Sequence, residues 1–252
     1  MASTPDNLSR ALFVRALFNG LASRYDVTNE VITLGQIRRW REKLARGVDL
    51  RAARAVLDVA TGTGDLALAV ARHSPEETQF LGIDLSPQML RRAQAKVKAR
   101  GLERRFTFIV ADATALPLKD GAVDCAVNAF FLRHLVSLPA AFVEFRRVLR
   151  PGGTLAALEL TQPTLPLFRQ VYGFLFRRWI PLLGGLVSRD RKAFDYLPRS
   201  WASFPGHREL LRILREAGYE RTRCVLMGMG VVALHTGVKP DGQALQARGR
   251  TR

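Results

Sequence analysis

The feature that most constrains the fold is an apolar segment that runs into a glycine-rich turn and then into a helix. Val56–Asp65 reads VLDVATGTGD, and Leu66–Arg72 follows with its apolar residues at helical spacing. A glycine in such a turn lets a ligand approach the backbone closely, because no Cβ blocks the way. In doubly wound α/β sheets this turn lies outside the carboxyl ends of the strands, where ligands bind. The segment therefore predicts a ligand site at the turn.

Strand-like and helix-like segments alternate along the rest of the chain. Apolar runs predict five strands, over residues 55–60, 79–83, 105–110, 123–129 and 154–160. Helical spacing predicts helices between them, over 66–72, 87–100, 138–149 and later 207–217. Two more β-like runs follow, near Thr222–Leu226 and Val231–Thr236. This alternation predicts an α/β fold with a doubly wound, mostly parallel, seven-stranded sheet.

The first fifty residues differ from the rest, because they carry no strand signal. Leu12, Phe13, Ala16 and Leu17 predict one apolar helical face, and a second helix is expected through Ile37 to Leu44.

Four segments follow from these patterns. We expect a helical N-terminal lead-in over 1–50 and a main domain over 51–240. A helical lid or insertion is expected over 165–205, and a disordered basic tail over 241–252.

Composition narrows the class of protein. The net charge of +17 favours anionic partners, but no nucleic-acid-binding motif accompanies it, so specific nucleic-acid binding is not expected. The two cysteines, Cys125 and Cys224, lack the spacing of a disulfide framework or a metal site, and no metal is expected. The polar start, Met1 to Arg10, and the lack of a long apolar run favour a cytoplasmic protein without a membrane span.

Two acids follow the second and third predicted strands. Asp84 lies twenty residues after Gly64, where a carboxylate can accept hydrogen bonds from the hydroxyls of a ribose. Asp112, with Ala113 beside it, follows the third strand, where a side chain can reach an adenine edge. Together with Gly62 and Gly64 these residues predict an adenosine-containing cofactor. The turn also fits the dinucleotide fingerprint G-x-G-x-x-A, so a nicotinamide-dependent oxidoreductase is a second interpretation.

The full set of motifs resembles the ubiquinone/menaquinone biosynthesis C-methyltransferase family, from about Phe18 to Lys239. The strongest markers are DVATGTGD at 58–65, DLSPQML at 84–90, DATALPL at 112–118 and RVLRPGG at 147–153. Further markers lie at both ends, at residues 18–29, 35–41, 195–197, 203–205 and 230–237.

The resemblance implies a class I methyltransferase whose cofactor is S-adenosyl-L-methionine. It places Thr63 at the methionine part of the cofactor, Asp84 at the ribose, and Asp112 with Ala113 around the adenine. A fourth family contact, usually Ser, falls on Ala129. The family's F-G-L-R-N-V segment reads Phe130-Phe131-Leu132-Arg133-His134-Leu135 here, so Phe131 and His134 depart from the pattern.

The family methylates a ring carbon of a polyprenylated quinol, and the resemblance implies demethylmenaquinol as the acceptor. Arg133 is the candidate to stabilise the developing phenolate, and His134 is a candidate base. Alternatively, Arg133 forms an internal ion pair and His134 is a polar loop residue. Tyr25 and Asp26 are expected near the site, where they pin the lead-in.

The isoprenoid tail of such an acceptor resides in a membrane, so we expect transient contact with the inner face of the cell membrane. The apolar and aromatic stretch Leu165–Val187, with interspersed arginines, fits an interfacial segment. It fits equally well a helical lid over the acceptor pocket or a contact in a homodimer. Three other functions stay open: a methyltransferase with a benzoquinol or another phenolic or lipid acceptor, the nicotinamide-dependent enzyme, and a non-catalytic partner in quinone synthesis.

Overall fold

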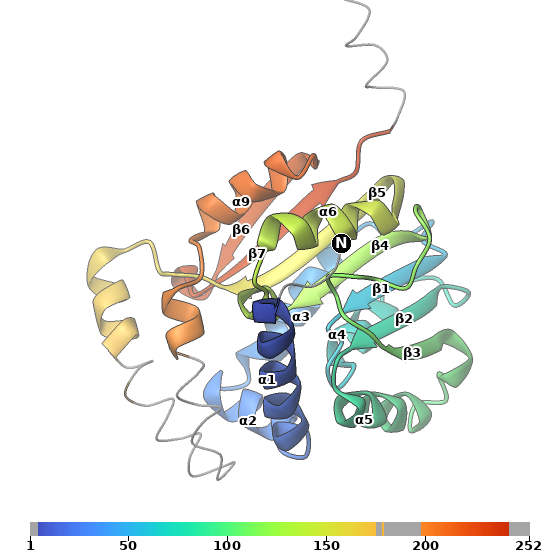
Figure 1. Cartoon of the computed structure of the whole chain (residues 1–252), viewed down its shortest axis with the longest axis horizontal. Coiled ribbons are helices and arrows are strands. Elements are labelled where there is room, and N and C mark those ends of the chain that lie inside the picture. The colour runs from blue at the N-terminus through green and yellow to red at the C-terminus, as the bar shows by residue number, and fades with distance from the viewer. Residues whose placement is uncertain (1–4, 175–177, 179–197, 242–252) are drawn as a thin grey trace, which may run out of the picture.

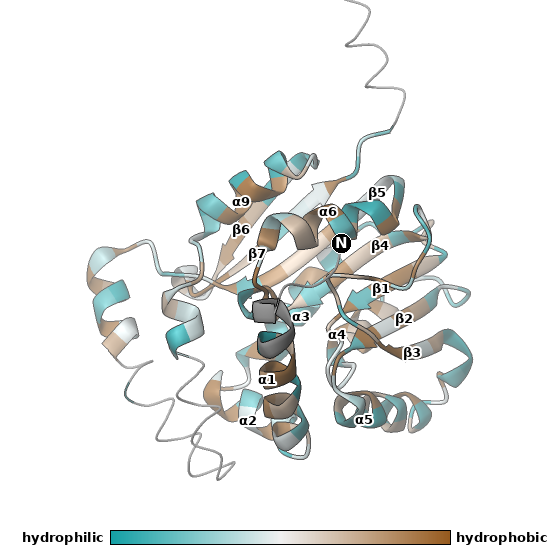
Figure 2. Cartoon of the chain, in the orientation of Figure 1, coloured by the Kyte–Doolittle hydropathy of each residue, from teal (hydrophilic) through white to brown (hydrophobic). Residues whose placement is uncertain are grey.

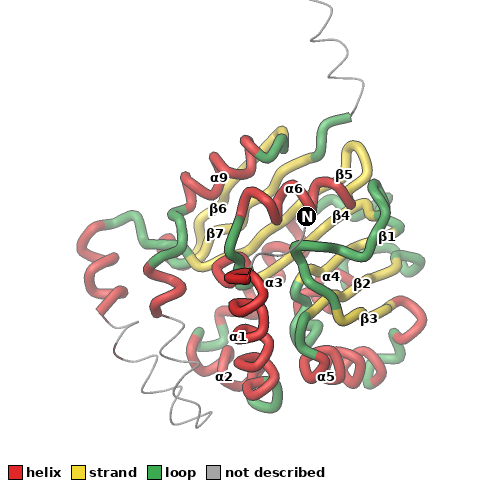
Figure 3. The backbone as a smooth tube through the Cα atoms, in the orientation of Figure 1, coloured by secondary structure: helices red, strands yellow, loops and turns green. Residues whose placement is uncertain are grey.

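A single twisted sheet of seven strands forms the centre of the molecule, and helices cover both of its faces (Figures 1 and 3). The computed structural model describes residues 5–174, 178 and 198–241. The strand order is β3-β2-β1-β4-β5-β7-β6. β1 to β5 pair in parallel, and β7 runs antiparallel to both of its neighbours, β5 and β6. The predicted doubly wound, mostly parallel, seven-stranded sheet is confirmed.

The strand bounds follow the apolar runs closely. The seven strands are β1 (Ala55–Val59), β2 (Gln79–Asp84), β3 (Phe106–Val110), β4 (Val123–Ala129), β5 (Leu149–Leu160), β6 (Glu220–Met227) and β7 (Val232–Val238). Only β5 departs from its prediction by more than three residues, because it begins at Leu149. Gly152 and Gly153 exchange backbone hydrogen bonds of 2.9 Å with Lys239, so the segment expected to be a turn extends the sheet.

Five helices flank the sheet within the described residues. They are α3 (Gln36–Gly47), α4 (Asp65–Ala71) and α5 (Pro87–Lys98), then α6 (Leu138–Val148) and α9 (His207–Glu216). One apolar cluster joins the sheet to α3 and α4, and a second cluster on the other face joins it to α6 and α9. The strands are largely apolar, whereas the outer surfaces of the helices are polar (Figure 2). Because helices bury both faces of the sheet, the parallel strands are continuous apolar runs in the sequence.

The ends of the flanking helices follow from local sequence signals. Ser86 caps α5, where its hydroxyl accepts a hydrogen bond from the Met89 amide at 3.1 Å, and Pro87 occupies the first turn. Ser137 caps α6 in the same way, through the Ala140 amide at 3.3 Å.

The lead-in is helical as expected and contains α1 (Pro5–Leu21), α2 (Tyr25–Ile32) and α3. The apolar face predicted for α1 is buried only in part, because Leu17 is buried while Leu12 and Phe13 are exposed. Val14, outside the predicted face, is buried as well. The reason is that α1 has two neighbours. Leu17 packs in a small cluster with Trp201, and the side of α1 that carries Val14 lines a cleft.

The predicted insertion over 165–205 is described only in part. Residues 166–174 and 198–202 are helical, and most of the segment between them, like the tail over 242–252, lies outside the described residues. Tyr172 and Trp201 pack edge to face at 5.9 Å, so the two helical pieces meet beside α1. The described part agrees with a helical insertion, and its role as a lid stays a prediction.

Candidate active site

A cleft lies at the carboxyl ends of the parallel strands, between the sheet and α1. Its empty volume, including the open solvent at its mouth, is about 1050 Å³. The strand ends and the loops after them contribute one side, and α1 with Tyr25 contributes the other. The residues that line it include Arg10, Val14, Phe18, Tyr25, Gly62, Asp84, Asp112, Ala129, Phe131 and His134. Several of the residues predicted for the site therefore line one cavity at the carboxyl edge of the sheet.

Gly62 and Asp84 form the floor of the cleft. The Gly62 amide donates to Asp84 Oδ2 at 2.9 Å, and the Ser86 amide donates to Oδ1 at 2.8 Å. Burial raises the pKa of the Asp84 carboxyl above its usual value, and these two amides oppose that shift. Each carboxylate oxygen keeps a lone pair that can accept a hydroxyl, so the geometry is compatible with a ribose at this position.

The two glycines of the turn have different roles. Gly62 has a positive φ of 56° and faces the cleft, and the nearest atom to a Cβ placed there is Tyr25 Cε1 at 4.0 Å. Gly64, with φ of 80°, caps α4 and packs against Ala93, whose Cβ lies 3.1 Å from where a Cβ would be. Gly62 is thus placed to meet a cofactor, and Gly64 sets the turn and its contact with α5.

Asp112 and Ala113 lie beyond the end of β3, and both line the cleft. Asp112 Oδ1 accepts hydrogen bonds of 2.8 Å from the amide and the hydroxyl of Thr114, which hold the loop in shape. Ala113 is buried in the apolar cluster on the α6 side of the sheet. The pair predicted for the adenine is therefore at the same cavity as Asp84.

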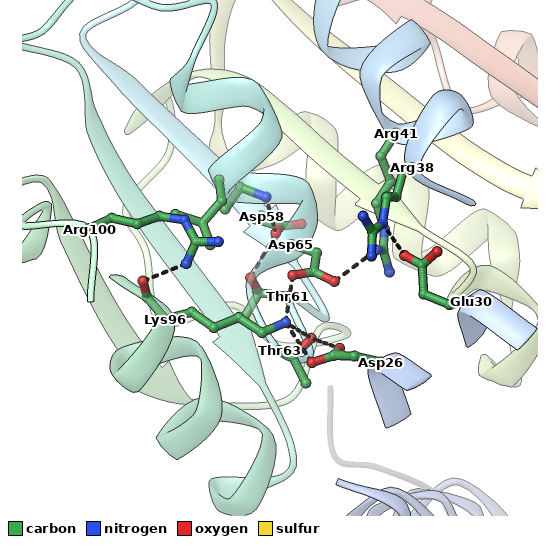
Figure 4. A network of polar contacts seen from close by, with 12 residues as sticks. Asp26, Glu30, Arg38, Arg41, Asp58, Thr61, Thr63, Asp65, Lys96 and Arg100 are labelled. Carbon is green, nitrogen blue, oxygen red and sulfur yellow. Dashed lines mark hydrogen bonds and ion pairs between the residues drawn. The ribbon is translucent and has the colours of Figure 1, made fainter. Parts of the chain in front are cut away.

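The hydroxyl of Thr63 is engaged away from the cleft, in a polar cluster that we call the Lys96 network (Figure 4). Its members are Asp26, Arg41, Thr63, Asp65 and Lys96. Lys96 Nζ lies 2.7 Å from Asp26 Oδ2, 2.5 Å from Asp65 Oδ1 and 3.0 Å from Thr63 Oγ1. Thr63 Oγ1 donates to Asp26 Oδ1 at 2.6 Å, and Arg41 Nη1 lies 2.8 Å from Asp65 Oδ2.

This network joins α2, α3 and α5 to the glycine turn. Through it Asp26 ties the lead-in to the glycine turn, as expected. The expected contact of Thr63 with the methionine part stays a prediction. As placed, Thr63 is not one of the described residues that line the cleft.

Asp58 braces the turn from inside the sheet. Its Oδ2 accepts hydrogen bonds from Thr61 Oγ1 at 2.7 Å and from the Ala67 amide at 3.2 Å. The side chain is almost fully buried, and this burial raises the pKa of the Asp58 carboxyl to about 7.

Arg133 points into the protein rather than into the cleft. Its Nη1 lies 2.6 Å from Glu159 Oε1 and also donates to the carbonyl of Phe130 at 2.6 Å. Both side chains of the pair are buried, with exposed fractions of 8% and 1%. The internal ion pair that the sequence left open is therefore present, and a direct role of Arg133 on the acceptor stays a prediction.

His134 lines the cleft and packs edge to face against Phe18, with ring centroids 5.2 Å apart. Burial, followed by the nearby Arg133 and Arg10, holds the pKa of His134 well below its usual value. The ring is therefore neutral around pH 7. A base with such a low pKa is weak, which favours a positioning role over proton abstraction.

Two strand ends carry backbone strain at the cleft. Ala60, after β1, and Phe130, after β4, have positive φ values of 55° and 58°, which non-glycine residues rarely adopt. Both line the cleft, and strain of this kind is typical of functional sites.

Sequence reasoning missed Arg10, Val14 and the contribution of α1 to the cleft wall. No local signal marks them, because α1 lies more than 100 residues from the η2 turn (Leu132–His134) that it meets across the cleft.

The remaining histidines lie elsewhere. His73 Nε2 is 2.6 Å from Glu42 Oε1, and His235 Nε2 is 2.9 Å from the carbonyl oxygen of His207. Within the described residues no cluster of three or more His, Cys, Asp or Glu could hold a metal.

Residues 6–239 match the sequence model of the ubiE/COQ5 methyltransferase family. The chain is 42% identical over 227 residues to the demethylmenaquinone methyltransferase of Thermus thermophilus, which spans 89% of this chain and 100% of that protein. It is 37% identical over 226 residues to the ubiquinone/menaquinone biosynthesis C-methyltransferase UbiE of Geobacter sp. strain M21, which spans 90% of this chain and 96% of that protein.

Solved structures share the fold. A SAM-dependent methyltransferase from Aquifex aeolicus has a TM-score of 0.59 at 20% identity and covers 84% of this chain and 97% of its own. The [4+2]-cyclase SpnF has a TM-score of 0.61 at 26% identity, with coverage of 81% and 82%. Since a cyclase and a methyltransferase share this architecture, the fold alone does not define the reaction.

Proposed function

The chain belongs to the ubiE/COQ5 methyltransferase family, and from this premise we propose that it methylates a ring carbon of a polyprenylated quinol, with demethylmenaquinol as the acceptor. S-adenosyl-L-methionine is the methyl donor. One observation of the geometry carries the proposal. A single cleft joins a polar end, with Gly62, Asp84 and Asp112, to an apolar wall that includes Val14 and Phe18. The polar end suits an adenosyl group, and the apolar wall suits a quinol ring.

The residues present fit the cofactor. Asp84 is held by two backbone amides with its carboxylate at the cleft, and Gly62 leaves the floor without a side chain. Asp112 and Ala113 line the same cavity beside them. When bound, S-adenosyl-L-methionine supplies an electrophilic methyl group on a sulfonium. The two acids place negative charge in a cleft that receives a cationic cofactor.

The chain's own residues orient the acceptor and exclude water. Phe18, His134 and Phe131 line the cleft, and a quinol ring between them is held against the methyl donor. Loss of a phenolic proton to water makes the ortho carbon nucleophilic. The bound cofactor would supply the methyl group to that carbon, and loss of the ring proton to water would restore the aromatic ring.

The names of the relatives point to two classes of acceptor ring. Relatives at 35–42% identity carry names of both kinds, demethylmenaquinone methyltransferases and ubiquinone/menaquinone C-methyltransferases. Phe131 and His134 both line the cleft and depart from the family pattern. Because a change in the lining can change the acceptor, more than one acceptor should be tested. A benzoquinol or another phenolic acceptor is the alternative that these two positions motivate.

We also propose that the enzyme contacts a membrane surface transiently, since its acceptor carries an isoprenoid tail. No helix among the described residues has the length and apolar character needed to cross a membrane. Leu167, Val171 and Phe174, on the described part of the insertion, are exposed apolar residues that support an interfacial or dimer contact. Co-sedimentation with anionic vesicles and with neutral vesicles, together with light scattering for oligomeric state, tests both.

The central experiment incubates the purified protein in detergent with S-adenosyl-L-methionine and either demethylmenaquinol or a polyprenylated benzoquinol. Mass spectrometry is expected to detect a product heavier by one methylene group from the naphthoquinol. Product from the benzoquinol alone would reassign the acceptor, and no product from either would refute the proposed function. Calorimetry against NAD in parallel is expected to give no binding, as the family assignment requires.

A further inference from the structure

The described part of the cleft wall contains one guanidinium cation. Among the described residues that line the cleft, Arg10 is the single Lys or Arg. It lies in the first half of α1, on the wall that sequence reasoning did not anticipate. The other titratable side chains that line the cleft are Tyr25, Asp84, Asp112 and His134. A cation at the acceptor site can stabilise the negative charge that the proposed reaction develops on a phenolic oxygen.

Arg10 is held in place by the opposite side of the cleft. Its Nε donates to the carbonyl oxygen of His134 at 3.1 Å, and its Nη2 donates to that of Arg133 at 3.2 Å. A guanidinium carries five N–H groups, so these two bonds leave three of them for a ligand. Neutral carbonyls orient the group without cancelling its charge. Among the side chains that the structure describes, which begin at residue 10, no carboxylate forms an ion pair with Arg10.

The surroundings strengthen the field of this cation. Ala11, Val14 and Leu135 line the same part of the cleft, and the neighbouring Phe18 ring packs against His134. In such a weakly polar environment, a fixed cation interacts with a developing anion more strongly than it would in water.

Arg133 is a poorer candidate for the same task. Its charge is already matched by Glu159 at 2.6 Å, and its guanidinium is buried outside the cleft lining. The structure thus separates two adjacent roles. Arg133 supports the η2 turn from inside, and the backbone carbonyls of that turn hold Arg10 at the cleft.

We propose that Arg10 is a catalytic residue that stabilises the phenolate oxygen of the acceptor. The inference rests on the proposed function for the identity of the acceptor. The phenolic O–H bond breaks and its proton leaves to water, while the oxygen retains the electron pair and is hydrogen-bonded by Arg10 N–H groups. The charge on Arg10 does not change during the reaction.

The test compares Arg10→Gln and Arg10→Lys with Arg15→Gln, a matched control at an exposed position of the same helix. Arg10→Gln is expected to lower kcat about 100-fold, the usual effect of removing one oxyanion donor. Arg10→Lys should recover part of that loss, and Arg15→Gln should resemble the wild type. The Kd of S-adenosyl-L-methionine, measured by calorimetry, should stay within twofold in all variants. A kcat of Arg10→Gln within threefold of the wild type, or a loss confined to cofactor affinity, would overturn the proposal.

A second readout does not depend on methyl transfer. The absorbance of 1-naphthol, titrated against pH with the protein and S-adenosylhomocysteine present, reports the ionisation of a bound phenol. The apparent pKa of the bound naphthol is expected to be lower in the wild type than in Arg10→Gln by about one unit, or tenfold in the ionisation constant. Equal values would overturn the role of Arg10. If the wild type methylates neither quinol, the proposed function fails, whereas the naphthol titration still tests the cation.

Discussion

The carboxylate of Glu159, near the end of β5, holds the guanidinium of Arg133 at 2.6 Å in an almost fully buried ion pair. The same guanidinium donates to the carbonyl of Phe130, whose φ of 58° turns the chain out of β4 toward the cleft. Arg133 N also lies 3.4 Å from Glu159 Oε2. The pair therefore fixes the start of the η2 turn, on which His134 and the anchor of Arg10 depend.

Breaking this pair on one side is expected to destabilise the fold strongly. Glu159→Gln leaves a buried guanidinium without its counter-charge, so the free energy of unfolding should fall by about 3–5 kcal/mol. Urea unfolding followed by circular dichroism measures the change. The double variant Glu159→Met with Arg133→Met removes both charges and should recover at least half of the loss. Equal destabilisation by the single and double variants would contradict a dominant ionic contribution.

Asp84 is expected to control cofactor affinity. Asp84→Ala removes the acceptor of the Gly62 and Ser86 amides and the carboxylate offered to the ribose. The Kd of S-adenosyl-L-methionine should rise tenfold or more, about 1.4 kcal/mol, in a calorimetric titration. Asp49→Ala, at an exposed pair with Arg51, provides a control that should leave the Kd unchanged. Unchanged binding by Asp84→Ala would remove this residue from the cofactor site.

The strand ends of the site could be predicted because they are local in sequence. An apolar run followed by glycines or by an acid predicts a strand with a polar group after it, and Gly62, Asp84 and Asp112 indeed line one cleft. The orientation of a side chain in a loop is not local. Arg133 is adjacent in sequence to His134, yet one pairs with Glu159 inside the protein and the other faces the cleft.

The second wall of the cleft could not be predicted for a similar reason. The apolar residues of α1 are distributed around the helix, because one side meets Trp201 and another lines the cleft. A periodicity argument assumes a single apolar face, and it grouped Leu12 and Phe13 with Leu17, although the first two are exposed. The anchoring of Arg10 on η2 is a contact between distant segments that carries no sequence signal.

The Lys96 network is expected to couple cofactor binding to the lead-in helices. Lys96→Met leaves Asp26 and Asp65 close together without the ammonium that joins them, so α2 should separate more readily from the glycine turn. Hydrogen exchange over residues 25–32 should become faster, and cofactor affinity should fall several-fold, about 1 kcal/mol. Lys98→Met, at an exposed position of the same helix, is the matched control. If both variants exchange at the wild-type rate, the network does not hold the lead-in.

Asp58 should make the stability of the protein depend on pH. Burial raises its pKa to about 7 in the folded state, from about 3.9 in the unfolded chain, so the unfolded state gives up its proton first as pH rises. The carboxyl thus has little effect on stability below pH 4, and it costs progressively more stability from pH 4 to 7, with the full cost above pH 7. Between pH 5 and 8 this amounts to about 2–3 kcal/mol.

Asp58→Asn removes the titration while leaving an oxygen for the Thr61 hydroxyl and the Ala67 amide. The difference in unfolding free energy between the variant and the wild type should therefore shift in favour of the variant from pH 5 to pH 8. Urea unfolding at both pH values measures this shift, and comparison at each pH cancels contributions from other acids, such as Asp84, whose pKa burial also raises. A constant difference would mean that Asp58 titrates alike in the folded and unfolded states, so that its burial beneath the glycine turn has no electrostatic cost.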